Sequence, residues 1–319
     1  MRKIIVTFLT IALLVCASRP GLAQNTKLKI AVIPKGTTHL FWKSVEAGAR
    51  KAGEELGIEI IWKGPLKEND RAQQIAIVEQ FVTEGVSGIV LAPLDDAALV
   101  RPVSTAGQKK IPVVIFDSAL KGEAGKDFVS FVATNNKKGG SLGGEQLAKL
   151  LGGQGKVILL RYQIGSASTV EREAGFVEAI GKNAGIQIIS ENRYAGATAG
   201  EAKTASMNML DKIKEANGIF CPNESSTFGM LLALRQTNLA GKIKFVGFDT
   251  SPPLIEALEK GEIDALVAQD PTRMGYEGVK TLVEHIRGKQ VLTVIDTGVR
   301  LITRDNLNDP EIKKLLGRP

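Results

Sequence analysis

The sequence predicts an α/β protein made of two similar, doubly wound parallel-sheet domains. Three observations lead there: apolar runs alternate with amphipathic segments, the order of motifs repeats once, and 319 residues suit two cores better than one. Runs without polar alternation are typical of strands covered by helices on both faces. Eight such runs are expected as strands, at 29–33, 88–92, 112–116, 156–160, 186–190, 218–221, 244–248 and 265–268.

The segments between these runs carry apolar residues at helical spacing. Ile75, Val78 and Val82 would share one face of a helix, and Phe176 and Ile180 would share a face of another. Strands therefore alternate with helices along most of the chain, which is the order of a parallel α/β sheet.

An internal repeat supports two copies of one architecture. "SGIVLAPLDDAAL" (87–99) matches "NGIFCPNESSTFG" (217–229), and "VVIFDSAL" (113–120) matches "FVGFDTSP" (245–252). The distance from the Gly of the first motif to the Asp of the second is 29 positions in one half and 31 in the other.

Three extended stretches are expected to carry the chain between the domains: "FVATNN" (131–136), "VAQDPT" (267–272) and "VIDTGVRL" (294–301). None of them resembles a flexible Ser/Gly linker, so three parallel crossings would form a hinge of restricted freedom. The expected domains are 27–133 with 270–297, and 134–269 with 298–319.

The first residues are typical of a secretory signal. Arg2 and Lys3 precede an apolar stretch at 4–15, which is too short to span a bilayer, and small residues favour cleavage after Ala23. The alternative, lipidation at Cys16, needs a small residue where a valine stands. We expect residues 1–23 to be removed on secretion.

Charge and cysteine content exclude some classes of protein. Cleavage would remove three cations and no acids, so the net charge falls from +7 to +4, and the cations are scattered among acids. This balance does not indicate a nucleic-acid partner. Only Cys221 would remain, in a strand-like run, where a buried and unreactive thiol is expected.

Ligands of open α/β sheets bind beyond the carboxyl ends of strands, which selects two aspartates. Asp117 and Asp249 each end an apolar strand with the same Phe-Asp-hydroxyl pattern. A carboxylate there either accepts hydrogen bonds from two neighbouring hydroxyls or caps a turn or helix. Its recurrence in both halves favours ligand contact.

Arg172 is a second candidate. Ser168 and Glu171 have capping-box spacing, so a helix is expected to begin at Ser168 with Arg172 in its first turn, on the face of Phe176. The side chain is then either a surface residue whose stem covers the core or a planar fork that points into the cleft. The residues alone leave both readings open.

Other polar and aromatic residues fall at strand ends. Asn223 lies between a strand and a helix, so it is a helix cap or a ligand contact, and Gln269 ends the strand at one crossing. Phe41 and Trp42 are adjacent at a helix start, where both rings cannot easily point the same way. One ring is expected to face the cleft.

The sequence has no motif that indicates an enzyme or a metal site. H-E-x-x-H and a Walker A sequence are absent, and "GGSLGG" (139–144) lacks dinucleotide-binding spacing. His39 and His285 are far apart in sequence, so they are not expected to bind a metal together. We expect no cofactor and no catalytic site.

With these segments in place, the chain resembles the ribose- and galactose-type periplasmic sugar-binding proteins, receptors of ABC importers with the type I periplasmic binding fold. The resemblance covers residues 27–304. It rests on "FWKSVEAGARKAGEELG", "IPVVIFDS", "TVEREAGF", "IFCPNE", "VGFDTSP" and "ALVAQDP", taken together and in order.

The resemblance implies a sugar held between two domains that close around it. Trp42 and Phe248 would stack on the sugar, with Phe41 nearby. Hydroxyl contacts would come from Asp117, Arg172, Asn223, Asp249 and Gln269.

The chain also departs from the ribose-type pattern. Lys35 and His39 stand where small hydroxyl residues and Asn are usual, and Ser118 replaces an Arg. An expected Asn is Ala92, and only Tyr194 remains to replace an aromatic residue near 196. We therefore expect a sugar or polyol other than D-ribose, contacted also by Lys35, His39 and Ser118, and a carboxylate or phosphate on it would suit the cations.

The resulting expectation is a monomeric periplasmic receptor that delivers a small sugar-like solute to the membrane permease of an ABC importer. An alternative is a sensory protein that presents its ligand to a chemoreceptor or histidine kinase. A secreted enzyme on the same fold is disfavoured by the missing motifs. A LacI-type repressor is disfavoured by the signal and by the lack of an N-terminal helix-turn-helix.

Overall fold

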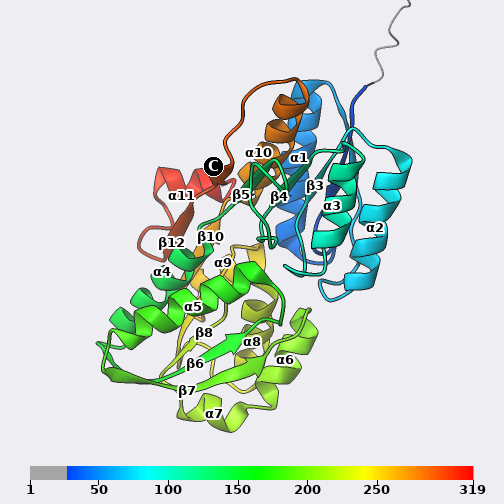
Figure 1. Cartoon of the computed structure of the whole chain (residues 1–319). Helices are drawn as coiled ribbons and strands as arrows, with labels where there is room; N and C mark the ends of the chain where they lie inside the picture. The colour runs from blue at the N-terminus through cyan, green and yellow to red at the C-terminus, as the bar shows by residue number, and fades with distance from the viewer. Residues whose placement is uncertain (1–26, 319) are drawn as a thin grey trace, which may run out of the picture.

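The computed structural model describes residues 27–318, which form two α/β domains side by side (Figure 1). The predicted signal and its cleavage site lie outside these residues. The strands of the first sheet are β1 (Lys29–Ile33), β2 (Glu59–Trp62), β3 (Gly88–Leu91), β4 (Val113–Phe116), β5 (Ser130–Ala133) and β11 (Val294–Asp296). Those of the second are β6 (Gln154–Arg161), β7 (Gly185–Tyr194), β8 (Gly218–Phe220), β9 (Lys244–Phe248), β10 (Ala265–Gln269) and β12 (Val299–Thr303).

The two sheets have the same strand order. The first reads β11-β5-β4-β3-β1-β2, and the second reads β12-β10-β9-β8-β6-β7. Replacing β1–β5 by β6–β10, and β11 by β12, converts one order into the other. All pairings are parallel except that of β10 with β12, which is antiparallel. The predicted fold class, two similar doubly wound domains, is confirmed.

Helices cover both faces of each sheet. Those of the first domain are α1 (Leu40–Leu56), α2 (Arg71–Glu84), α3 (Val100–Gln108) and α10 (Pro271–Ile286). Those of the second are α4 (Asn136–Leu150), α5 (Ala167–Gly181), α6 (Ala199–Met207), α7 (Leu210–Glu215), α8 (Glu224–Gln236), α9 (Pro252–Glu259) and α11 (Pro310–Leu315). In β1, Ile30 and Val32 pack toward α1 and α10, while Ala31 and Ile33 pack toward α2 and α3. Both faces of the strand are buried, which explains its continuous apolar run.

The chain passes between the sheets three times. After β5 it enters α4, which packs on the second sheet, and after β10 it enters α10, which packs on the first. The short link between β11 and β12 is the third passage. Each of the stretches 131–136, 267–272 and 294–301 therefore contains strand residues and the point at which the chain crosses from one sheet to the other.

Two local predictions were wrong. The first concerns α5, which begins at Ala167 after an N-cap at Ser166 that makes no side-chain cap bond. Ser168 does not cap the helix because its hydroxyl accepts a hydrogen bond from Lys35 Nζ instead, at 2.9 Å. The second is β2, which was not expected as a strand. It is an edge strand whose residues are only partly buried.

The Gly-rich stretch 139–144 is a packing face. Its residues Gly139 to Gly143 spell G-x-S-x-G, a pattern that in hydrolases requires a strand-to-helix turn. Here Ser141 lies inside α4, and its hydroxyl donates to the Lys137 carbonyl at 3.1 Å. A Cβ on Gly140 would collide with the carbonyl oxygen of Arg172 in α5. The glycines therefore bring two helices into contact, and Ser141 does not lie at the strand-to-helix turn that the hydrolase pattern requires.

The close approach of α4 and α5 makes Gly140→Ala strongly unfavourable. We expect it to lower the free energy of unfolding by about 2 to 3 kcal/mol in urea denaturation, because backbone atoms must move to admit a methyl group. Gly181→Ala is the matched control, since it ends α5 and its added Cβ would meet nothing within 4 Å. That variant should be slightly stabilised. Equal stability of the Gly140 variant and the wild type would contradict this packing.

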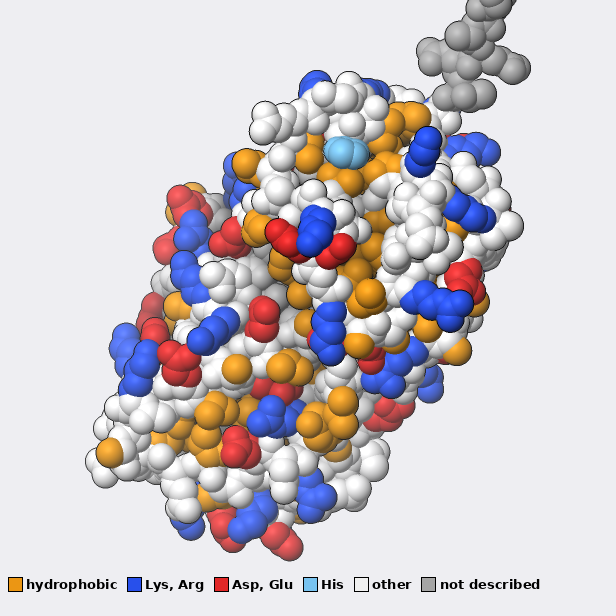
Figure 2. Space-filling model, in the orientation of Figure 1, with side chains coloured by type: hydrophobic (Ala, Val, Ile, Leu, Met, Phe, Trp, Pro, Cys, Tyr) orange, Lys and Arg blue, Asp and Glu red, His pale blue; other side chains and the backbone are white. Residues whose placement is uncertain are grey.

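Basic and acidic side chains are interspersed over the face shown in Figure 2, without a broad patch of one sign on that face. Within residues 27–318, no helix is both long enough and apolar enough to cross a bilayer.

Candidate ligand-binding cleft

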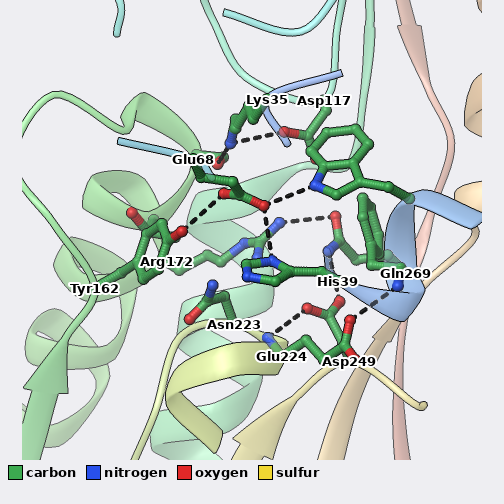
Figure 3. Close-up of a pocket in the computed structure, with 14 residues that line it drawn as sticks. Lys35, His39, Glu68, Asp117, Tyr162, Arg172, Asn223, Glu224, Asp249 and Gln269 are labelled. Carbon is green, nitrogen blue, oxygen red and sulfur yellow. Dashed lines mark hydrogen bonds and ion pairs between the residues drawn. The ribbon is translucent and has the colours of Figure 1, made fainter. Parts of the chain in front are cut away.

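A pocket lies between the two domains, where the carboxyl ends of the strands face each other (Figure 3). The first domain lines it with loops after β1, β2 and β4, and the second with residues after β6, β8 and β9. Its lining consists of Lys35, His39, Phe41, Trp42, Glu68, Asp117, Tyr162, Ser168, Thr169, Arg172, Asn223, Glu224, Asp249 and Gln269. The unfilled space among them is about 30 Å³. Because a single water needs roughly 10–15 Å³, a larger ligand must enter with movement of the domains or side chains.

Nine of the eleven predicted site residues line this pocket, and Ser118 and Phe248 do not. Ser118 is fully buried, and its hydroxyl accepts a hydrogen bond from the Ser168 amide at 3.1 Å. The Phe248 ring is also fully buried and lies 4.1 Å from the Arg172 guanidinium. Both residues support lining side chains from behind.

Asp117 and Asp249 occupy equivalent places, directly after β4 and β9. Both have left-handed backbones, with φ of 62° and 70°, a conformation that Asp tolerates better than most residues. Asp249 accepts hydrogen bonds from the Glu224 amide at 2.8 Å and from Gln269 Nε2 at 2.7 Å. Burial raises the pKa of Asp249 to about 6, although the Arg172 charge and these hydrogen bonds oppose the rise. Neither Asp caps the helix that follows it; Ser251 is the N-cap of α9.

Arg172 is a planar fork buried in the second domain, not a surface side chain. It donates to Asn136 Oδ1 at 2.8 Å, to the Pro222 carbonyl at 3.0 Å and to Gln269 Oε1 at 2.7 Å. Burial lowers the pKa of the guanidinium, while nearby carboxylates, Asp249 first, act against this. Arg172 therefore ties α5 to α4, to the loop after β8 and to the end of β10.

Asn223 caps a helix, which is one of the two roles that the sequence left open, and it also lies at the pocket. It is the N-cap of α8, in a capping box with Ser226. Phe41 and Trp42 both line the pocket, with rings 5.1 Å apart and nearly perpendicular. Trp42 is 2% exposed and also packs edge-on against Phe116.

Each cation of the first loop has a carboxylate partner within the protein. Lys35 Nζ lies 2.7 Å from Asp117 Oδ2, and His39 Nδ1 lies 2.8 Å from Glu68 Oε1. The other ring nitrogen of His39 faces the Ala197 carbonyl at 3.0 Å. Burial would lower the pKa of His39, but the Glu68 carboxylate outweighs it and raises the pKa to about 9. An imidazolium suits these two acceptors, since both of its nitrogens donate.

The sequence did not single out Glu68, Tyr162 and Glu224. Glu68 is buried in the loop after β2, and despite the opposing effect of burial its pKa is lowered to about 2, chiefly by His39. Tyr162 directly follows β6, and Glu224 follows Asn223 and accepts from the Phe41 amide at 2.8 Å. The strand-end rule would have found Glu68 if β2 had been recognised.

The charges of the lining are nearly balanced. Four carboxylates face three cations, which are Glu68, Asp117, Glu224 and Asp249 against Lys35, His39 and Arg172. The polar groups can donate and accept hydrogen bonds in many directions, beside two aromatic rings. Within residues 27–318 there is no group of three or more His, Cys, Asp or Glu side chains arranged to hold a metal ion.

Residues 30–290 match the family described as periplasmic binding protein domain. The chain belongs to this family. The periplasmic binding protein described here is 28% identical over 309 residues to the ribose import binding protein RbsB of Salmonella typhimurium, covering 95% of this chain and 99% of that protein. It is 30% identical over 287 residues to the D-ribose/D-allose-binding protein of Pseudomonas aeruginosa, covering 87% of this chain and 89% of that protein.

Solved structures of similar proteins agree with this assignment. A solute-binding protein of Agrobacterium vitis with bound D-fucose is 36% identical, with a TM-score of 0.86 over 89% of this chain and 98% of that one. Another, from Agrobacterium radiobacter in complex with D-arabinose, is 32% identical, with a TM-score of 0.87 over 91% and 99%. These relatives are transport binding proteins, not enzymes.

Proposed function

We propose that this periplasmic binding protein is the substrate-binding component of an ABC importer and that it captures one neutral monosaccharide or polyol in the cleft. The observation that carries the proposal is the pair Asp117 and Asp249, placed at equivalent strand ends on opposite sides of one pocket. The relatives solved with D-fucose and D-arabinose support the same ligand class.

The lining residues would divide the work of recognition. Carboxylates accept from vicinal hydroxyls, the Arg172 fork donates, and the amides of Asn223 and Gln269 do both. C–H groups of a sugar ring would pack against Phe41 and Trp42. Phe248 would act indirectly, by supporting Arg172 from below.

A neutral ligand fits the cleft better than an acidic one. Lys35 and His39 suggested an anion from the sequence, but each is paired with a buried carboxylate. An acidic sugar would have to displace Asp117 or Glu68 from its cation, or enter beside four carboxylates. A ligand without charge requires neither.

Closure of the two domains would be the binding mechanism. A ligand that contacts both domains only when they are together shifts the population toward the closed form. The three links between the sheets would bend, and the permease would recognise the closed shape. We propose the periplasm as the site of action, with residues 1–23 as the secretion signal. The names of the relatives favour transport over the sensory alternative.

A thermal-shift screen tests the ligand class. After refolding to remove carried-over ligand, neutral pentoses, hexoses and polyols are compared with sugar acids and sugar phosphates. One or more neutral sugars should raise the melting temperature, since ligand at 100 times Kd stabilises by about 2.7 kcal/mol. A shift only with sugar acids or phosphates would contradict the neutral ligand, and no shift with any sugar would contradict the receptor.

A further inference from the structure

Glu68 is the centre of a buried hydrogen-bond cluster that joins the two domains (Figure 3). Its Oε1 accepts from Trp42 Nε1 at 2.7 Å and lies 2.8 Å from His39 Nδ1. Its Oε2 accepts from the Tyr162 hydroxyl at 2.9 Å. Trp42 and His39 belong to the first domain, as Glu68 does, whereas Tyr162 belongs to the second.

Two further contacts of the cluster cross between the domains. Gln163 Nε2 donates to the Glu68 carbonyl at 2.7 Å, and His39 Nε2 lies 3.0 Å from the Ala197 carbonyl. The Glu68 side chain is 6% exposed, and Tyr162 is fully buried. If the Tyr162 hydroxyl were removed while the domains stayed together, Glu68 Oε2 would be buried without this hydrogen-bond donor. A buried acceptor without a donor destabilises the structure that contains it.

The partners of Glu68 leave it little capacity for ligand. A carboxylate offers about four acceptor positions, and three are taken by the indole, the imidazole and the phenol. Glu68 accepts the hydrogen bond of the Trp42 indole, and we have proposed that this indole packs against the sugar. The phenol comes from Tyr162, a residue of the second domain.

We infer that Glu68 is a positioning residue that holds Trp42 and His39 in the first domain and binds the second domain when the cleft closes. The inference rests on the proposed function. Opening would take Tyr162, Gln163 and Ala197 away with the second domain and leave Glu68 with its partners in the first. Closing would add these three contacts, so the Glu68 cluster stabilises the closed form and slows release of the sugar.

Tyr162→Phe is the test variant because it removes one hydroxyl and keeps the ring. Tyr276→Phe is its matched control, since the Tyr276 hydroxyl also donates to a glutamate, Glu55 Oε2 at 2.6 Å, but within the first domain between α10 and α1. Glu68→Gln serves as a second test variant that keeps the shape of the side chain.

Stopped-flow binding of the sugar that gives the largest thermal shift separates the two rate constants. We expect Tyr162→Phe to weaken binding about tenfold, which corresponds to about 1.4 kcal/mol and to the loss of one hydrogen bond to a charged group. The dissociation constant should rise because koff increases. The association rate constant kon should stay within twofold of the wild type, because the sugar first binds to the open form. Tyr276→Phe should bind as the wild type does. A structural role alone would not produce this split, and an unchanged koff in Tyr162→Phe would overturn the inference.

A second readout does not need a sugar. Spin labels on cysteines introduced at Glu123 and Lys182, exposed residues of the first and second domains, report the interdomain distance, and buried Cys221 is shielded from labelling. Tyr162→Phe and Glu68→Gln should both shift the distance distribution toward open forms, and Tyr276→Phe should not. If no sugar bound the wild type, the proposed function would fail while this measurement still decided the role of Glu68. Identical distributions in all variants would overturn it.

Discussion

Replacing Arg172 by methionine is expected to abolish detectable sugar binding and to lower the free energy of unfolding by about 3 to 5 kcal/mol. The change leaves Asn136, the Pro222 carbonyl and Gln269 without their shared donor. It also removes the buried positive charge that opposes the rise in the pKa of Asp249. Urea denaturation and titration calorimetry measure the two effects.

Arg50→Met is the control for this variant. Arg50 is exposed on α1 and pairs with Glu46 one turn away at 2.6 Å, so its loss should cost less than about 1 kcal/mol. Arg172→Lys keeps the charge but not the planar fork, and it should still bind sugar weakly if it folds. An Arg172→Met protein that kept its stability and affinity would show that the fork does not organise the site.

The pair Lys35 and Asp117 should behave as one unit of stability. Lys35→Met leaves a buried carboxylate without its cation, and Asp117→Asn leaves a buried ammonium without its anion. Each single change should therefore lower the free energy of unfolding by about 3 kcal/mol. Asparagine is chosen because it tolerates the left-handed backbone at this position. The double variant should cost about 2 kcal/mol less than the sum of the single variants.

Urea denaturation of the wild type and the three variants completes this cycle. The same four-protein cycle on Lys244, which is exposed, and Asp264, which is partly buried, 3.1 Å apart, provides a comparison for a pair with less burial. Its coupling should be below about 1 kcal/mol. Additive effects at Lys35 and Asp117 would mean that the lysine is not committed to the aspartate and is available to an acidic ligand.

The fold was predictable because its signal is local and repeated. Each buried strand is a short apolar run, and the Phe-Asp endings of β4 and β9 recur at nearly equal spacing. The strand-end rule then brought Asp117 and Asp249 to one pocket without any knowledge of their contacts. β2 escaped because an edge strand is covered on fewer sides, so its run is short and only partly buried.

The pairing of charges was not predictable from the sequence. Lys35 and Asp117 are distant along the chain. Glu68 lies in the loop that follows β2, the strand that the sequence did not predict. Without their carboxylates, Lys35 and His39 indicated an anionic ligand. Phe248 shows the same limit for packing: the family resemblance implied a ring that stacks on the sugar, but the buried ring packs against the Arg172 guanidinium. Tertiary contacts, not local pattern, decide these roles.

The central claim is that one neutral sugar is held between the domains by side chains from both. A crystal structure of the complex with the sugar that gives the largest thermal shift tests it most directly. The account predicts sugar hydroxyls within hydrogen-bond distance of Asp117 in the first domain and of Arg172 and Asp249 in the second. A sugar bound outside the cleft, or in contact with only one domain, would contradict it.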